Sequence, residues 1–222
     1  MKILIILALL TGTFHSFAQV DSNNVIHQKP GTIIENLDTY DGCPPIGTTS
    51  NLALEELNKL KNRYKMPSDS DFYKNITLDS LLAPGNDENR FNVNEAVEIT
   101  GYVMEVKPGG TEGCNCKATD RTYQDTHIVL IADPKLTSGS KRVIVEVTPR
   151  MRFIMSKNGI DWSTTTLESE LKGHWITVQG WLFYDKEHFA EAENTSPENE
   201  KDWRATAWEV HPITHIEIVN KQ

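Results

Sequence analysis

Short apolar or alternating segments, separated by turn residues, fill the chain from residue 95 onward and constrain its fold more than any other feature. Residues 96–107 alternate apolar with polar side chains, a period of two that is typical of a half-buried strand. Similar segments predict four more strands, at residues 126–132, 142–148, 174–184 and 203–219. Helical patterns at residues 151–157 and 165–171 separate the third strand from the fourth.

Two of the predicted strands contain an interior glycine, Gly101 in the first and Gly180 in the fourth. Such glycines often mark the sharp bends that a small closed barrel needs. Five strands with a helix between the third and the fourth have the connectivity of the oligonucleotide/oligosaccharide-binding (OB) barrel. We therefore predict a mostly β protein with a five-stranded OB-fold-like barrel (β-β-β-α-β-β) over residues 95–222; an open α+β sandwich is the alternative.

The first 18 residues have the three parts of a secretory signal peptide. Lys2 precedes an apolar run, residues 3–10, and Ser16 and Ala18 are the small residues expected before a cleavage site. No later apolar run approaches the length of a membrane span. We expect an exported protein, periplasmic or extracellular, with no membrane span.

Residues 19–94 are predicted to form an N-terminal arm and one helix that packs on the barrel. The arm, up to about residue 49, is polar and has no sustained period. Over residues 51–65 an apolar stripe recurs at helical spacing, and Met66-Pro67 ends it. This stripe is formed by Ala53, Leu54, Leu57, Leu60 and Tyr64.

Three cysteines are present, Cys43, Cys114 and Cys116. Export to an oxidising compartment favours one disulfide and one remaining thiol. A bridge within residues 114–116 would close a very small, strained ring. The sequence therefore predicts a disulfide between Cys43 and either Cys114 or Cys116, with a zinc site as the weaker alternative because paired C-x-x-C spacing is absent.

The chain is acidic, with a net charge of −9 and a pI of 5.3. Two long loops, residues 108–124 and 185–202, are expected to flank the ligand-binding face of the barrel, and long loops on small domains are commonly functional. The second loop is strongly acidic, so it would repel a phosphate backbone. Nucleic acid is therefore not expected as a partner.

Two pairs of side chains beside these loops suggest a metal site. Asp125 and His127 point to one side of the second strand, and Asp185 and His188 follow the fourth. Two carboxylates and two imidazoles can bind a divalent metal and leave a position open for water, as hydrolysis requires. The alternative is that both histidines have ordinary structural roles. His211 is set aside as a ligand because a hairpin would place it over about 20 Å from His188.

A second enzyme hypothesis uses Glu146, Arg150 and Arg152, which match the acidic ligand and arginines of secreted nucleases with a similar barrel. The chain lacks an acidic pair in the first strands that would match the calcium site of those nucleases. An exposed glutamate followed by two surface arginines is the plainer interpretation.

Aromatic side chains concentrate on the last two strands, where Trp181 and Trp208 are candidate ligand-stacking residues. In the fourth strand Trp175, Trp181 and Phe183 share one side, and the other side is also apolar. One side must therefore be covered, either by the 51–65 helix and the arm or by a ligand such as a glycan.

The strand region also resembles exported bacterial proteins of unknown function with an OB-type barrel. The resemblance rests on VEITGYVMEVKPGG, GCNC, DTHIVLIADP, VEVTPRMR, GWLFYDKEH and WRATAWEVHPITHIE, with LNKLKNR in the helix. It implies a barrel and an exported setting, but it does not indicate a substrate.

Together these features predict a binding module, rather than an enzyme, that takes a small molecule, glycan or protein through its two long loops and needs no cofactor. A metal-dependent hydrolase with a divalent metal is the first alternative. A structural or interaction role in the cell envelope is the second.

Overall fold

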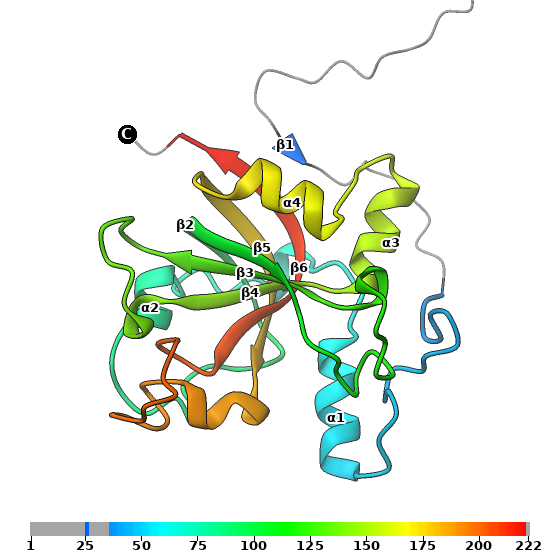
Figure 1. Cartoon of the computed structure of the whole chain (residues 1–222), viewed down its shortest axis with the longest axis horizontal. Coiled ribbons are helices and arrows are strands. Elements are labelled where there is room, and N and C mark those ends of the chain that lie inside the picture. Colours follow the sequence, from blue (N-terminus) through cyan, green and yellow to red (C-terminus); the bar gives the residue numbers. More distant parts are fainter. Residues whose placement is uncertain (1–24, 27–35, 221–222) are drawn as a thin grey trace, which may run out of the picture.

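A computed structural model describes residues 25–26 and 36–220 of the chain and shows a mostly β protein (Figure 1). The signal peptide predicted at residues 1–18 lies outside the described residues. The strands are β1 (Val25–Ile26), β2 (Ala96–Pro108), β3 (Thr126–Ile131), β4 (Val143–Val147), β5 (Trp175–Tyr184) and β6 (Trp208–Val219). The helices are α1 (Leu52–Lys61), α2 (Leu78–Leu82), α3 (Pro149–Lys157) and α4 (Thr164–Leu171).

Five of these strands close into a barrel in the order β2-β3-β4-β6-β5, because β5 pairs with both β2 and β6. The β4–β6 pair is parallel, and the other pairs around the barrel are antiparallel. The short β1 adds to the outer edge of β6. This closed, mixed barrel is compatible with an OB-like fold and confirms the predicted fold class.

The barrel interior is apolar, as the period-two patterns require. In β5, Ile176, Val178 and Leu182 belong to the core, and Trp181 and Phe183 point away from it. Leu167 and Leu171 of α4 are also part of this core. Figure 1 shows α3 and α4 on the upper side of the barrel, with α1 and the segment after β5 on the lower side.

Gly180 lies where β5 and β6 approach most closely. A Cβ atom there would come within 2.4 Å of the Pro212 carbonyl oxygen and 2.6 Å of Val210 Cγ1. The pairing register of β5 and β6 shifts at the same place. A glycine is therefore required for the bend that the sequence predicts at this position.

The last strand starts at Trp208, five residues later than predicted from residue 203. Asp87, which is fully buried, explains the difference because it takes the hydrogen bonds of the preceding segment. Its carboxylate accepts from Thr206 Oγ1 at 2.7 Å and from the Ala207 backbone N–H at 2.9 Å, and its carbonyl accepts from Trp208 Nε1 at 2.8 Å.

Helix α1 ends at Lys61, before the predicted stop at Met66-Pro67. Its C-cap, Asn62, donates from its side chain to the carbonyls of Pro45 and Cys114, both at 2.9 Å. These tertiary hydrogen bonds draw the chain away from the helical path. None of the helices in the described part of the chain is long and apolar enough to cross a membrane.

A disulfide joins Cys43 to Cys116, and Cys114 is a free, buried thiol. This is one of the two pairings that the sequence predicts. The bridge ties the segment before α1 to the loop between β2 and β3.

Candidate functional site

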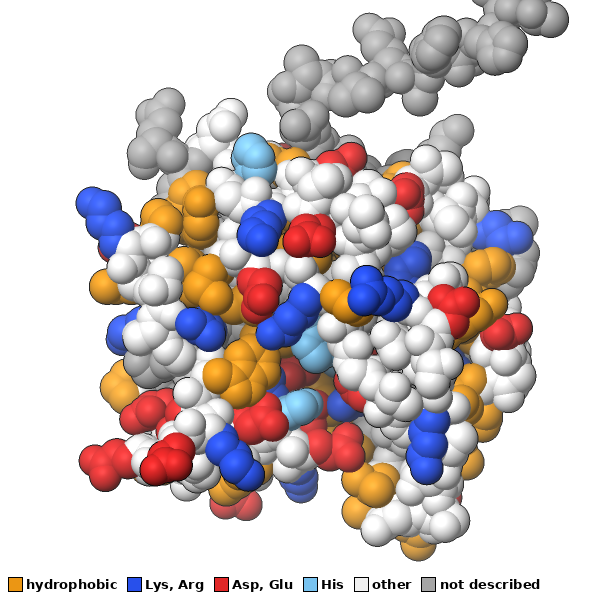
Figure 2. All heavy atoms as spheres, in the orientation of Figure 1, with side chains coloured by type: hydrophobic (Ala, Val, Ile, Leu, Met, Phe, Trp, Pro, Cys, Tyr) orange, Lys and Arg blue, Asp and Glu red, His pale blue; other side chains and the backbone are white. Residues whose placement is uncertain are grey.

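Charged side chains are buried or half-buried on the outside of the barrel, between its wall and the segments that cover it. We call this group the charged cluster. It consists of Lys61, Glu112, Asp125, His127, Glu146, Asp185, Arg204, Glu209 and His211. In OB-like barrels the outer face of the second and third strands, here β3 and β4, is the usual ligand-binding face. Figure 2 shows histidine, acidic and basic side chains gathered around a hollow on the side drawn.

Glu146 of β4 lies at the centre of the charged cluster. Its Oε1 is 3.3 Å from His127 Nε2, and its Oε2 is 3.3 Å from His211 Nδ1. Glu146 is 3% exposed and His211 is 0% exposed. Oε2 of Glu146, Nε2 of His127 and both ring nitrogens of His211 make no hydrogen bond. Burial, and then the negative charges of Glu209 and Glu112, raise the pKa of Glu146 well above its ordinary value.

The loop between β2 and β3 brings Glu112 and Asp125 over this centre. Asp125 Oδ2 accepts a hydrogen bond of 2.8 Å from Asn115 Nδ2, and its buried Oδ1 has no partner. Burial and the charge of Glu112 raise the pKa of Asp125. Gly109 lets the loop pass, since a Cβ there would lie 2.9 Å from His127 Nε2.

Lys61, at the end of α1, is 2% exposed and neutralises part of the charged cluster. Its Nζ lies 2.9 Å from Asp185, 3.1 Å from Glu112 and 3.5 Å from Glu187. Burial disfavours the ammonium, but the charges of Asp185 and Glu112 outweigh it and raise the pKa of Lys61. For Glu112 burial also opposes ionisation, but the nearby His127 imidazole, 3.9 Å away, and the charge of Lys61 lower its pKa.

A second ion pair joins Arg204 to Glu209, and both side chains are buried. Burial would raise the pKa of Glu209, but its interactions with Arg204, His211 and Lys61 together outweigh burial and lower the pKa. Lys61 and Arg204 thus pair with Glu112, Asp185 and Glu209. Asp125 and Glu146 have no ion pair with a lysine or arginine among residues 36–220.

The apolar stripe of α1 does not face the barrel core. The buried residues of α1 are Asn58 and Lys61, because the barrel surface beneath the helix is charged. The stripe instead lines a hollow of about 620 Å³, which we call the amphipathic groove. Its lining is Ala53, Leu54, Glu56, Leu57, Leu60, Glu88, Asn89, Phe91, Asn92, Val93, Tyr184, Lys186, Glu187 and Trp208.

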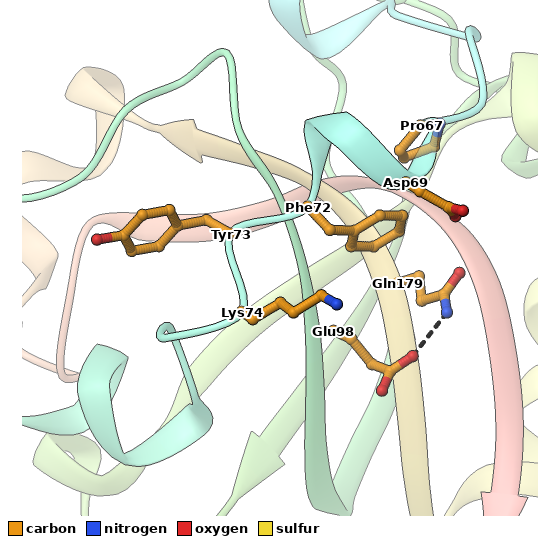
Figure 3. Close-up of a pocket in the computed structure, with 7 residues that line it drawn as sticks. All are labelled: Pro67, Asp69, Phe72, Tyr73, Lys74, Glu98 and Gln179. Carbon is orange, nitrogen blue, oxygen red and sulfur yellow. Dashed lines mark hydrogen bonds between the residues drawn. The ribbon is translucent and has the colours of Figure 1, made fainter.

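A third hollow, of about 640 Å³, lies over β2 and β5 (Figure 3). Figure 3 shows Phe72 and Lys74 facing Glu98 and Gln179, which share a hydrogen bond of 2.6 Å. Asp69, Lys74 and Glu98 are exposed, so water already solvates their charges. Nothing in this hollow requires a ligand.

Three of the four residues predicted to bind metal, Asp125, His127 and Asp185, belong to the charged cluster, and His188 lies beside it. Asp125 and His127 lie near Glu146. Asp185 is held by Lys61, and His188 Nδ1 lies 3.0 Å from Glu191 Oε2 and its Nε2 3.9 Å from Asp185.

Among the described residues, three sets of side chains bring ligand atoms within 4.8 Å of one another. The sets are Asp125, Glu146 and His211; Glu112, His127 and Glu146; and Glu112, Cys114 and Asp125. Asp185 and His188 are in none of them.

His211, which the sequence argument sets aside, is a member of one of these sets. That argument measured its separation from His188, whereas the side chains converge at Glu146. A signal was present in the sequence: Glu146, Glu209 and His211 are polar residues inside strongly apolar strands. Such residues on a buried outer face must meet partners there.

Trp181 and Trp208 have different surroundings. Trp181 is covered by Arg63, whose guanidinium lies 5.2 Å from the ring centroid, and its Nε1 donates to the Lys65 carbonyl at 2.8 Å. The segment around α1 thus covers this side of β5. Trp208 is 1% exposed and belongs to the apolar core, and it forms part of the lining of the amphipathic groove.

Arg150 and Arg152, the arginines of the nuclease hypothesis, bind the protein itself. Arg150 donates to the carbonyls of Leu37 and Cys43, at 3.0 and 2.9 Å. Arg152 donates to the carbonyls of Thr122, Gln124 and Trp162. Their guanidinium groups hold loops in place, which does not favour a nuclease.

No protein-family model matches this chain, and no curated protein sequence matches it.

Proposed function

We propose that this protein is an exported binding module that holds a small amphipathic molecule in the amphipathic groove. The observation that carries the proposal is the orientation of α1. Its apolar residues Leu54, Leu57 and Leu60 line a groove instead of packing into the core. An apolar helix face that the protein itself leaves uncovered favours a ligand.

Beneath the groove lies a layer of aromatic core side chains, in which Trp208 is 1% and Tyr184 9% exposed. Tyr184 and Trp208 have ring centroids 5.1 Å apart, and Phe91 packs edge-on against Trp208 at 5.3 Å. The hydrogen bond from Trp208 Nε1 to the Asp87 carbonyl fixes the indole. A volume of about 620 Å³ is within the range of small-molecule sites.

The charges around the groove favour a positive group on the ligand. Glu56, Glu88 and Glu187 line it, with one lysine, Lys186. Glu56 pairs with Lys59 and Glu187 with Lys61, whereas Glu88 has no ion pair among the described residues and is the carboxylate left for a ligand. Aromatic rings also attract cations. The proposed ligand class is therefore a small molecule with a planar apolar body and a cationic group.

Two features support the exported setting. Residues 1–18 have the pattern of a signal peptide. The Cys43–Cys116 disulfide is of the kind that persists in oxidising compartments.

The test compares two flat probes of similar size, proflavine, which is cationic, and naphthalene sulfonate, which is anionic. Fluorescence titration should show tighter binding of proflavine to the wild-type protein. Leu57→Trp, which fills the groove, should weaken that binding at least about tenfold. Glu88→Gln should weaken the binding of proflavine and leave the binding of naphthalene sulfonate unchanged.

The control is Glu98→Gln in the hollow of Figure 3, which should leave both titrations unchanged. Equal binding of the two probes, no binding of either, or full binding to Leu57→Trp would contradict the proposal. A peptide or a second copy of the chain in the groove would appear as protection of Leu57 in exchange measurements without proflavine binding, and would also contradict it.

A further inference from the structure

We propose that the charged cluster binds one divalent transition-metal ion of the zinc class through Asp125, Glu146 and His211. His127 and Glu112 lie on the solvent side of this site, where His127 contacts the second oxygen of Glu146. The site is separate from the amphipathic groove and does not depend on the function proposed for it.

The spacing of the candidate ligand atoms is close to the spacing of ligands around a bound ion. One ligand atom from each of Asp125, Glu146 and His211 lies within 4.8 Å of the other two. Ligands at about 2.0–2.2 Å from a common zinc ion are at most about 4.4 Å apart. Small side-chain rotations are enough to close the set around an ion.

The same residues have buried polar atoms whose hydrogen-bonding capacity is unused, although His211 Nδ1 lies 3.3 Å from Glu146 Oε2 and 3.5 Å from Glu209 Oε2. Asp125 Oδ1, Glu146 Oε2 and both nitrogens of His211 are buried and make no hydrogen bond. The three residues are 1%, 3% and 0% exposed, so bulk water does not reach them. Buried polar atoms are normally hydrogen-bonded, and a metal ion uses these same lone pairs.

The charge of the cluster also calls for a cation. Five buried or half-buried carboxylates belong to the cluster, those of Glu112, Asp125, Glu146, Asp185 and Glu209, and among the lysines and arginines of the described residues only Lys61 and Arg204 form ion pairs with them. Arg150 and Arg152 also interact electrostatically with Asp125, without forming an ion pair. Lys61 and Arg204 pair with other carboxylates than Asp125 and Glu146. A dication placed between Asp125 and Glu146 supplies the countercharge that these two carboxylates do not receive from an ion pair with a lysine or arginine.

The ligand types select the kind of ion. Imidazole nitrogen together with carboxylate oxygen suits zinc and its neighbours in the first transition row better than calcium or magnesium. His127 is a positioning residue, because its contact with Glu146 Oε1 orients the carboxylate. The ligands come from the β2–β3 loop, β4 and β6, so the ion would fasten that loop to the barrel wall.

The experiment measures metal content and zinc affinity directly. Protein purified without chelator is dialysed and its metals are determined by elemental analysis; chelator-treated protein is then titrated with zinc in a calorimeter. Cobalt(II) replaces zinc in a parallel sample and reports ligation through its visible absorption. The variants are Glu146→Gln and His211→Gln, with His127→Ala for the positioning role and His188→Ala as the matched control.

Wild-type protein and His188→Ala should each retain about one ion per chain and give the same cobalt spectrum. Glu146→Gln and His211→Gln should lose the ion, and His127→Ala should bind zinc about 10- to 100-fold more weakly. Circular dichroism of the chelator-treated variants checks that each one is folded.

Three results would overturn the inference. They are wild-type protein that takes up no stoichiometric zinc, a folded Glu146→Gln or His211→Gln that keeps its metal, and loss of metal from His188→Ala. The last result would favour the Asp185 and His188 site instead.

Discussion

The barrel interior and the charged cluster lie on opposite faces of the same strands, and both are shielded from water. All five residues of β4 are buried. Val143, Val145 and Val147 face the core, and Glu146 faces the charged cluster. The inner face is held by non-directional apolar packing, whereas the outer face is stable only where each charge meets a partner.

This difference shows that the burial of a side chain does not by itself indicate how well its site tolerates substitution. The interior should accept apolar side chains of similar volume. The charged cluster should accept only changes that leave no charge alone.

Loss of Lys61 should have the largest effect. Lys61→Ala leaves Asp185 and Glu112 without their buried cation, and such losses cost about 3–5 kcal/mol of unfolding free energy. Urea denaturation in the presence of chelator measures it. Lys59→Ala is the control on the same helix, because its ion pair with Glu56 is exposed to water and should contribute little to the unfolding free energy. Equal costs for the two variants would show that the charged cluster is solvated.

Truncation in the barrel interior should come next. Leu130 of β3 is fully buried in the core, so Leu130→Ala should cost about 3 kcal/mol through lost transfer energy and a cavity. Leu130→Met keeps the volume and should cost less than about 1.5 kcal/mol. The same denaturation experiment compares them. If the Met variant were as unstable as the Ala variant, the barrel interior would tolerate substitution no better than the charged cluster.

The disulfide links the covering segments of the cluster to one another. Cys43→Ser should lower the unfolding free energy by about 2–4 kcal/mol, because the bridge spans 73 residues and restricts the unfolded chain. Melting curves without reductant measure this, and adding reductant should destabilise the wild type and not the variant. An unchanged melting temperature without reductant would contradict the prediction.

An exposed carboxylate should have the smallest effect. Hydrogen bonds from Thr166 and Ser163 hold Asp161 before α4 and lower its pKa below the ordinary 3.8. The ionised Asp161 therefore adds to the unfolding free energy at pH values above 3.8, and this addition is lost as the pH falls through the lowered pKa of the folded state. At pH 7 Asp161→Asn should be less stable by about 1 kcal/mol or less. Near pH 2 the difference between the two proteins should shrink toward zero; a constant difference would rule out the carboxylate as its source.

The strand pattern predicts most of the barrel and part of the candidate site. The five strands, the two short helices and the bend at Gly180 follow from local periodicity and one glycine. The sequence also predicts Asp125 and His127 as candidate site residues, since both flank a long loop. Arg150 and Arg152 look like surface arginines in the sequence, yet they bind buried backbone carbonyls.

The start of β6 and the orientation of α1 could not be predicted from the sequence. The start of the strand depends on a distant side chain, Asp87, and the orientation of the helix depends on the distant carboxylates Glu112 and Asp185 that pair with its Lys61. A local pattern cannot show that an acidic residue far back in the chain takes the hydrogen bonds of residues 206–208.

The sequence by itself determined the fold class, because side chains alternate across a strand through covalent geometry that acts between neighbours. It also limited the disulfide to two pairings through Cys43. Only the tertiary structure decided that Glu146, His211 and Asp125 meet, and that the apolar side of α1 lines a groove. These outcomes depend on how strand register and loop path bring distant charges together, and the energy of a buried charge is set by those neighbours rather than by its place in the chain.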